Sequence, residues 1–319
     1  MNNEETLLQG IAADPSDDAA WLILADCLEE AGEGERAELV RLRESLRQLA
    51  LGEERRAKEA RMQEMLLAGV RPSVPHLTLG YPKMPDLTLA LIPPGTFLMG
   101  SPEDELDRWS DEGPRHPVTI TRGFWLGIHH VAQMQWRAVM GDNPSHFKGL
   151  KLPVERVSWT ECQEFCAKLG KRTGRTVRLA TEAEWEYACR AGTTSPFHFG
   201  PTLSSDYANY DANIVYGPQG KKGAYRQKPV EPGSFPPNAF GLYDMHGNIR
   251  EWCHDVKRPY DGEHVTDPGK KGGKPGSART VRGGSWYNVP WFCRSACRLS
   301  EGPGRQDKMI GCRILVELA

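Results

Sequence analysis

Two cysteines near the C-terminus have a spacing that could support chemistry. Cys293 and Cys297 are four residues apart, so their side chains lie on one side of either a helix or a strand. Paired thiolates hold soft metal ions such as copper(I), or act as a redox pair. The alternative is that both are small buried hydrophobes, which is the commoner fate of a free cysteine. The spacing leaves both interpretations open.

Other reactive residue types form no recognisable catalytic motif. The sequence contains no phosphate-binding loop, no serine-nucleophile elbow and no zinc cluster. His116 has no visible partner for general base catalysis, so we expect a packed or hydrogen-bonded histidine. We also expect three arginines to donate to backbone carbonyls or buried carboxylates: Arg294, Arg298 and Arg313.

Composition limits the class of protein and its partners. The chain has 319 residues, of which 39% are hydrophobic, which is enough for a folded core. Its formal net charge of −2 comes from interspersed acids and bases, so nucleic acid and anionic membranes are not expected partners. No apolar run is long enough to span a membrane. The polar N-terminus does not resemble a signal peptide, so we expect a cytoplasmic protein with eight reduced cysteines.

The chain divides into two regions and a joint. Residues 1–68 are expected to form a helical module, because apolar residues such as Trp21, Leu24 and Leu28 recur at helical spacing. This module resembles the short repeat-companion module of planctomycete proteins in residues 25–30 and 36–43, which would make it a docking module. The alternative is a small bundle without chemistry. Four prolines in residues 69–85 predict a semi-stiff extended linker.

Residues 86–319 predict a domain with few regular elements. Two capping boxes, Ser158 with Glu161 and Thr181 with Glu184, predict helices from these residues to about 171 and 192. A third helix is expected at 133–140. Period-two or continuous apolar patterns predict five strands, at 87–92, 117–120, 124–128, 281–286 and 312–317. So few elements over this length predict a core held largely by loops.

The order of the motifs in this region resembles the formylglycine-generating enzyme (sulfatase-modifying factor) family. The resemblance covers 86–319 and implies a loop-rich α+β fold related to C-type lectins. The family includes sulfatase-activating oxidases, sulfoxide synthases, pyoverdine-maturation proteins and binding domains, so the fold alone does not define an activity. The motifs that carry the resemblance are Ile92–Ser101, Asp111–His116, Leu152–Trp159, Arg178–Gly192, Gly233–Asn248, Arg282–Trp286 and Cys293–Ala296.

The resemblance implies where a copper site would lie, and the sequence departs from it. The oxidase binds copper(I) through two cysteines, three and eight residues after the serine of its Gly-Gly-Ser motif. Counting from Ser285, these positions are Asn288 and Cys293, and Cys293 belongs to a Cys-Arg-Ser-Ala motif frequent in relatives without the copper pair. Arg250 also replaces a tryptophan of the oxygen pocket. Copper is therefore not expected, and Ser285, Cys293 and Cys297 remain the catalytic candidates.

The resemblance also implies calcium at the loop 244–251. Its ligands would be the side chains of Asp244 and Glu251 with the carbonyls of Gly247 and Ile249, which are hard oxygens of the kind calcium prefers. The alternative is an acidic loop stabilised by nearby donors such as Arg250. A second, weak site would use Asn209 and the Tyr210 carbonyl, because the aspartate expected near residues 223–225 is absent.

Two interpretations of function remain. The first is a ligand- or protein-binding module, whose partner is a protein or peptide. The second is a formylglycine-generating or related metal-dependent oxidase that acts on a protein cysteine, against which the altered copper positions argue. The binding interpretation places recognition on mixed, largely apolar residues near the C-terminus: Tyr287, Asn288, Val289, Trp291, Phe292, Cys297 and Leu299.

Overall fold

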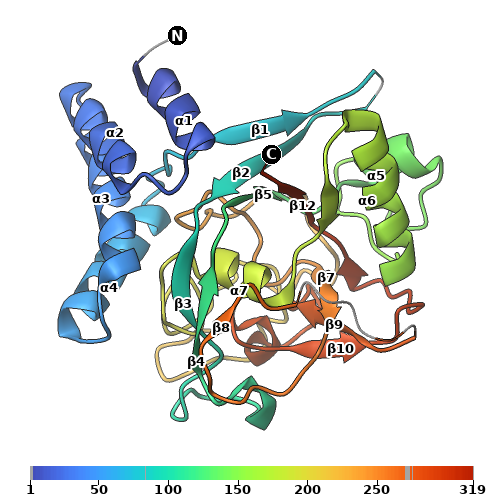
Figure 1. Ribbon diagram of the computed structural model, residues 1–319. Coiled ribbons are helices and arrows are strands. Elements are labelled where there is room, and N and C mark those ends of the chain that lie inside the picture. The colour runs from blue at the N-terminus through green and yellow to red at the C-terminus, as the bar shows by residue number, and fades with distance from the viewer. Residues whose placement is uncertain (1–2, 83, 270–273, 275, 319) are drawn as a thin grey trace.

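The N-terminal region is a module of four helices. The computed structural model describes residues 3–82, 84–269, 274 and 276–318 (Figure 1). The helical sequence is interrupted at residues 49–52, which separates the last two helices of the module. None of the helices among the described residues is long and apolar enough to cross a membrane. The four helices are α1 (Asn3–Ala13), α2 (Asp18–Glu30), α3 (Gly34–Gln48) and α4 (Glu53–Leu67).

The larger region contains three sheets. The central one has five strands in the order β1-β2-β5-β12-β6, and all its neighbouring pairs are antiparallel. Its strands are β1 (His76–Leu79), β2 (Leu87–Ile92), β5 (Phe124–Gly127), β6 (Val177–Leu179) and β12 (Ile314–Glu317). The other two sheets are smaller and include parallel pairs. One has four strands, in the order β10 (Leu299–Glu301), β9 (Arg279–Arg282), β7 (Arg250–Val256) and β11 (Ile310–Gly311). The other has three strands, in the order β3 (Gly95–Met99), β4 (His116–Ile120) and β8 (Val265–Thr266).

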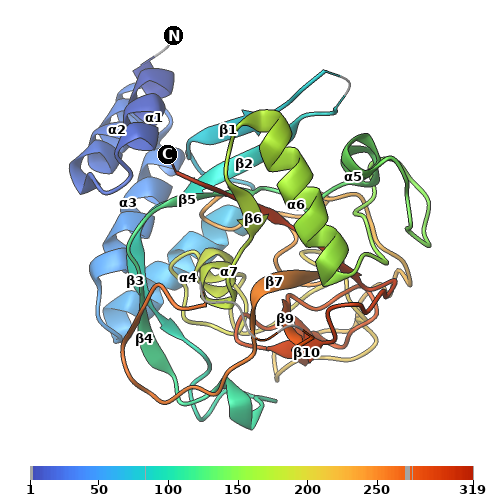
Figure 2. The same ribbon diagram turned by 45° about the vertical axis from the view of Figure 1, so that its right-hand side comes forward.

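The three predicted helices of this region are present. They are α5 (Gln133–Met140), α6 (Trp159–Thr173) and α7 (Glu182–Arg190), and both predicted capping boxes are formed. Figure 2 shows α6 crossing in front of the central sheet. Two short 3₁₀ helices complete the elements, η1 (Ser110–Glu112) and η2 (Pro290–Cys293). The predicted α+β fold with a preceding helical module is therefore confirmed.

The joint between the two regions is part of the sheet. Residues 69–85 are predicted to be an extended linker, and residues 70–75 contain no helix or strand. His76–Leu79, however, pairs with Leu87–Ala90 as the edge strand β1. Leu79 is buried against the same hydrophobic cluster as Trp21 of the module. This segment therefore joins the two regions through packing as well as through the chain.

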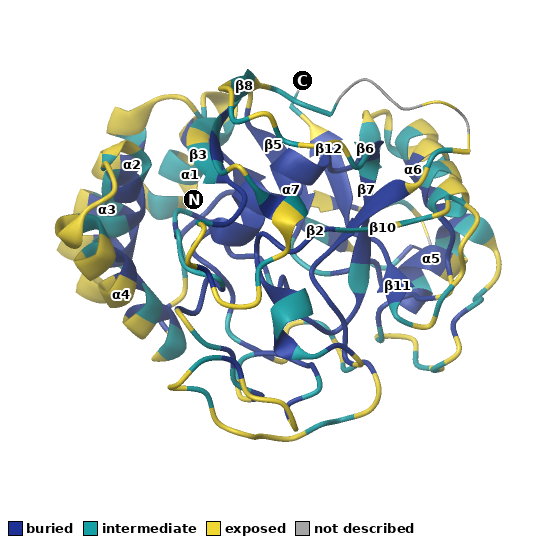
Figure 3. Cartoon of the chain, turned by 90° about the horizontal axis from the view of Figure 1, so that it is seen from below, coloured by how far each residue is buried: buried dark blue, intermediate teal, exposed yellow. Residues whose placement is uncertain are grey.

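The module shares its hydrophobic core with the larger region. Leu46 and Met62 belong to the same buried cluster as Phe240 and Leu315. Figure 3 shows that the helices of the module are exposed on their outer side and buried toward the sheets. Polar contacts accompany this packing: Arg55 Nη2 donates to Gly192 O at 2.7 Å. The module is thus an integral part of this fold.

Glu59 of α4 is the polar centre of this contact. It is 4% exposed, and its carboxylate accepts hydrogen bonds from Thr194 N at 2.9 Å and from Thr194 Oγ1 at 3.0 Å. Arg55 Nε donates to the same carboxylate at 2.8 Å. Through these bonds the carboxylate holds the 192–195 turn against α4.

We predict that Glu59→Ala lowers the free energy of unfolding by about 1–3 kcal/mol, because it leaves Arg55 Nε and the half-buried Thr194 without their shared acceptor. Urea unfolding followed by circular dichroism measures the change. Glu64→Ala is the matched control in the same helix, since 70% of the Glu64 side chain is exposed. Equal stabilities of the two variants would contradict a structural contact through Glu59.

Candidate functional site

The candidate site lies in the turn that follows β9. The strand was expected to continue to residue 286 but ends at Arg282, because Gly283 and Gly284 have φ angles of 91° and 70°. These left-handed conformations favour glycine. A Cβ at Gly284 would lie 2.4 Å from Cys293 Sγ. The glycine therefore permits the chain to fold back so that residues 285–293 pack closely on the turn.

Asn288 occupies the position expected of the first copper ligand. Its Oδ1 accepts hydrogen bonds from Ser285 Oγ at 2.8 Å and from Arg250 Nε at 2.9 Å. Arg250 begins strand β7, which lies beside β9 in the same sheet. The two residues that depart from the oxidase pattern therefore contact each other. Together with Ser285 they form a hydrogen-bonded group without a sulfur ligand.

The two candidate cysteines are buried thiols. Cys293 is 0% exposed and Cys297 is 2% exposed. Burial raises the pKa of Cys297 to about 12 and raises the pKa of Cys293 further above its ordinary value. A thiol rather than a thiolate is therefore present at neutral pH, and the thiolate is the form that binds metals and attacks electrophiles. Cys293 Sγ lies 4.0 Å from the Val289 carbonyl, inside the 3₁₀ turn.

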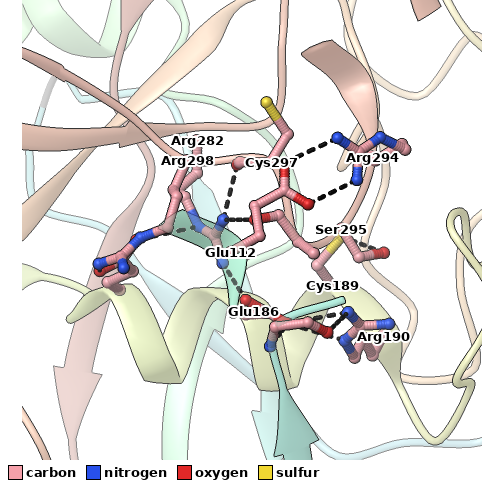
Figure 4. Close-up of polar contacts among 12 residues, drawn as sticks. Glu112, Glu186, Cys189, Arg190, Arg282, Arg294, Ser295, Cys297 and Arg298 are labelled. Atoms are coloured by element: carbon pink, nitrogen blue, oxygen red, sulfur yellow. Dashed lines mark hydrogen bonds and ion pairs between the residues drawn. The ribbon is translucent and has the colours of Figure 1, made fainter. Parts of the chain in front are cut away.

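Buried arginines next to these cysteines are all neutralised by glutamates. Figure 4 shows Glu186 between Arg190 and Arg282, and Glu112 against Arg294. Arg282 Nη1 also donates to the carbonyls of Ala296 and Cys297, at 2.9 and 2.6 Å. These bonds immobilise the segment that carries Cys297.

The expected structural role of three arginines is confirmed. Arg294 Nη1 donates to Glu105 at 2.6 Å and to Glu112 at 2.7 Å. Arg298 binds the Glu182 carboxylate through Nε and Nη2. Arg313 binds Glu251 and also donates to the carbonyls of Gly127 and Tyr243. The charges of these three arginines are therefore paired with carboxylates inside the fold.

The predicted recognition surface is exposed only in part. Tyr287 has 54% of its surface exposed, whereas Asn288 and Cys297 are buried. Val289, Trp291, Phe292 and Leu299 are half-buried. Phe292 packs on Trp109, with ring centroids 5.9 Å apart, and Trp109 is 48% exposed. Trp109 was not among the predicted residues, because it is distant in the sequence.

A hollow of about 500 Å³ lies next to Tyr287. Its walls come from the loop containing His146 and Arg156 and from the 306–309 turn. Arg156 has a left-handed φ of 58°, and its backbone N–H donates to Asp307 O at 3.0 Å. This bond joins the two walls. Periodicity could not reveal the hollow, because both walls are irregular loops.

Two of the predicted calcium ligands, Ile249 and Glu251, already have partners. His130 Nε2 lies 2.9 Å from Ile249 O and 3.1 Å from Glu251 Oε1. Glu251 also accepts from Trp185 Nε1 and Arg313. Burial alone would raise the pKa of the Glu251 carboxyl, but the Arg313 guanidinium beside it holds this pKa at about 2. His130 was not singled out in the sequence, and only its proximity in the fold reveals its role.

Asp244 is the predicted ligand with a free oxygen. Its Oδ2 accepts from Gly233 N at 2.8 Å, whereas its buried Oδ1 has no partner among the described residues. Burial raises the pKa of this carboxyl, and a bound cation would reverse that effect. The donor set fits a cation at Asp244, but a calcium ion that also used Ile249 and Glu251 would compete with His130.

The predicted second calcium site, at Asn209 and Tyr210, is occupied in part by hydrogen bonds within the chain. Asn209 Nδ2 donates to Lys228 O and to Asn248 Oδ1, at 2.9 and 3.1 Å, and its buried Oδ1 has no partner among the described residues. The Tyr210 carbonyl accepts from Ala212 N at 3.0 Å. No group of three or more His, Cys, Asp or Glu side chains in the described part of the chain is placed to hold a metal ion. Calcium at this site remains a prediction.

The three small sheets, the capped helices and the glycine turn define a C-type-lectin-like α+β domain. Residues 81–318 match the family model of the sulfatase-modifying factor enzyme 1-like domain, so the chain belongs to the formylglycine-generating enzyme (FGE-sulfatase) family. Members of this family bind calcium. The match does not include the helical module, whose resemblance to the planctomycete module remains a prediction.

Relatives in this family have different activities. The chain is 32% identical over 208 residues to the formylglycine-generating enzyme of Mus musculus, covering 62% of this chain and 52% of that protein. It is 30% identical over 169 residues to the inactive C-alpha-formylglycine-generating enzyme 2 of Bos taurus, covering 52% and 48%. The chain thus spans about half the length of these curated relatives. Identity at this level shows the family but not the activity.

A solved structure of a variable protein is also similar. Treponema denticola variable protein 1 aligns with a TM-score of 0.63 and 26% identity, covering 76% of this chain and 99% of that one. PvdO from Pseudomonas aeruginosa aligns with a TM-score of 0.59 and 31% identity, covering 73% and 95%. Both similarities agree with the fold described above.

We predict that calcium stabilises His130→Ala more than the wild type. Removing the imidazole frees Ile249 O and one Glu251 oxygen for a cation, which then joins Asp244. Differential scanning fluorimetry with 1 mM calcium against excess chelator measures the shift in Tm. His264→Ala, which alters a histidine bonded to Thr119, is the control. An equal calcium shift in all three proteins would contradict competition at this loop.

Glu155 behind the hollow predicts a pH-dependent stability. Its Oε1 accepts from Phe147 N at 2.7 Å, its Oε2 has no partner among the described residues, and burial raises its pKa to about 7 from an ordinary 4.5. The folded state therefore binds more protons than the unfolded state between these two pH values. Stability from this group is greatest at low pH and falls as pH rises toward 7.

Glu155→Gln should therefore stabilise the protein more at pH 8 than at pH 5, relative to wild type. Urea unfolding at both pH values gives the two differences. Glu164→Gln, with 54% of the glutamate side chain exposed, should change stability equally at both. A Glu155→Gln effect that does not depend on pH would show that the carboxyl titrates normally.

Proposed function

We propose that this protein is a copper-free member of its family that acts as a binding module for a protein or peptide ligand. The observation that carries the proposal is the hydrogen-bonded group of Ser285, Asn288 and Arg250. It stands where the oxidase would have its first copper ligand and its pocket tryptophan. An amide and a guanidinium are poor ligands for copper(I), which prefers soft sulfur.

The state of Cys293 supports the same conclusion. Its thiol is 0% exposed and packs over Gly284, so neither oxygen nor a substrate thiol can reach it without movement of the turn. Burial raises its pKa, which disfavours the thiolate. Arg250 acts to lower this pKa, but burial and the neighbouring Cys297 outweigh it.

The similarities to non-oxidase relatives agree with a binding role. The bovine relative is named as an inactive enzyme, and the Treponema denticola protein is named as variable. In this proposal calcium has a structural role at the Asp244 loop and takes no part in chemistry. The exposed Tyr287 and Trp109 mark the face that offers apolar contact.

The alternative function is a formylglycine-generating or related oxidase. It would need copper(I) on Cys293 with a second ligand other than Asn288. Cys297 is the only other cysteine that the sequence places nearby on the same segment, and its pKa is raised to about 12. The alternative therefore requires both thiols to ionise in a buried environment. This is unfavourable unless metal binding offsets the free energy of ionisation.

We predict that the purified protein binds no stoichiometric copper(I) and forms no aldehyde on a Cys-x-Pro-x-Arg peptide in the presence of oxygen. Competition with a copper(I) chelator and mass spectrometry of the peptide measure the two results. Cys293→Ser is the matched variant and should behave like the wild type. Tight copper binding with aldehyde formation, both lost in Cys293→Ser, would replace the binding proposal by the oxidase.

A further inference from the structure

The geometry points to an acidic peptide segment as the ligand of the hollow beside Tyr287. This inference rests on the proposed binding function and gives the chemical class of its partner. The segment would place carboxylate side chains against Arg156 and Lys308 and an apolar side chain against Tyr287.

The cations around the hollow lack anionic partners. Arg156 and Lys308 are exposed wall residues, and within the described residues neither forms an ion pair. The one carboxylate in the walls, Asp307, is already bonded to Arg305 at 2.6 Å. Opposite charges on a ligand would therefore meet two unpaired cations and one neutralised acid. Such complementarity favours the approach and orientation of an anionic partner.

Arg250 adds a third positive charge close by. Its backbone N–H donates to Met309 O at 2.8 Å, so it lies next to the 306–309 wall. The six arginines that are 3% or less exposed each pair with a glutamate: Arg43, Arg190, Arg282, Arg294, Arg298 and Arg313. Half-buried Arg250 has no ion pair among the described residues, and its Nε donates to Asn288 Oδ1. Asp307 and Glu301 act on this guanidinium only from a distance, without an ion pair among the described residues, so it adds positive charge to this face.

The hollow also offers apolar contact. Tyr287 is 54% exposed and packs edge-on against Trp286, with ring centroids 5.5 Å apart. Lys308 Nζ lies over the Trp286 ring at 5.4 Å from its centroid, which fixes the ammonium above an aromatic surface. Tyrosine and arginine are enriched in recognition surfaces because they combine apolar area with polar ends.

The shape favours a peptide over a small anion. The hollow of about 500 Å³ is open to solvent, and its wall cations are themselves exposed. An open site holds a small ion weakly, because solvent and salt screen its charge. A peptide segment can contact both walls and Tyr287 at once, so that several weak contacts add together. The fixed backbone bond between Arg156 and Asp307 keeps the two walls in register for such a ligand.

The test is selection from a random twelve-residue peptide library displayed on phage, with the full-length protein as bait. We expect the selected peptides to be enriched in Asp and Glu next to aromatic or aliphatic residues. The charge variant Arg156→Gln/Lys308→Gln should lose this enrichment. The matched control is Arg56→Gln/Lys171→Gln, which removes one arginine and one lysine from exposed positions on α4 and α6 and should keep it.

Fluorescence anisotropy with the best selected peptide gives the size of the effect. The charge variant should bind about tenfold more weakly, as expected for the loss of two exposed ion pairs, and the wild-type affinity should fall as salt rises. Replacing Asp and Glu of the peptide by Asn and Gln should have a similar effect. Tyr287→Ser should weaken binding while leaving the salt dependence unchanged, since it removes apolar contact only. Circular dichroism and Tm establish that each variant is folded.

Three outcomes would overturn the inference: recovery of no peptides above background, enrichment of neutral or basic peptides, and equal binding by the charge variant. A peptide displaced fully by millimolar inorganic phosphate would indicate a small-anion site instead. None of these results restores the copper ligands, so the copper-free binding function would stand. Conversely, copper-dependent aldehyde formation would overturn the proposed function without altering the charge preference of the hollow.

Discussion

Buried ion pairs between arginines and glutamates determine how the C-terminal segment is held. Arg282, Arg294 and Arg298 are each 3% or less exposed, and their glutamate partners come from distant parts of the chain. Glu105 and Glu112 lie in the loop before β4, and Glu182 and Glu186 lie in α7. Breaking one buried pair costs about 3–5 kcal/mol, because the remaining charge loses its partner. The turn from β9 to β10 therefore has little freedom to rearrange.

This network also decides the chemistry of the neighbouring cysteines. A cation beside a thiol ordinarily lowers its pKa, and Arg250, Arg282 and Arg294 all lie near Cys297. The charges of Arg282 and Arg294 are already compensated by carboxylates, however, and burial then dominates. Cys297 and Cys293 consequently behave as small apolar side chains. The same arginines that make the turn rigid thus leave its thiols unreactive.

The helical module is connected to this turn by a short route through the fold. Glu59 of α4 holds Thr194, and two residues further on Pro196 O accepts a hydrogen bond from Ser295 N at 2.7 Å. Ser295 lies between Arg294 and Arg298 of the ion-pair network. The module therefore contacts, through residues 194–196, the same segment around Ser295 that the buried glutamates hold through Arg294 and Arg298. The contacts of the module with this segment are therefore structural.

The sequence by itself determined the features that depend on neighbouring residues. The capping boxes at Ser158 and Thr181 start α6 and α7 where predicted, because both partners of each box lie within one helical turn. Gly141, with a φ of 96°, ends α5 at the predicted residue. The order of the family motifs gave the α+β fold, and counting from Ser285 identified Asn288 and Arg250 as departures from the oxidase.

Tertiary structure alone decided which distant residues meet. Arg250 and Asn288 were each recognised in the sequence, but only the pairing of β7 with β9 brings Asn288 Oδ1 to 2.9 Å from Arg250 Nε. His130 reaches Ile249 and Glu251 across more than a hundred residues, and Trp109 packs on Phe292 in the same way. No local pattern encodes these contacts, because they arise from loops whose paths are set by the whole core. The sequence therefore defined the family and the altered copper positions, and the fold defined the charged hollow and the buried state of the thiols.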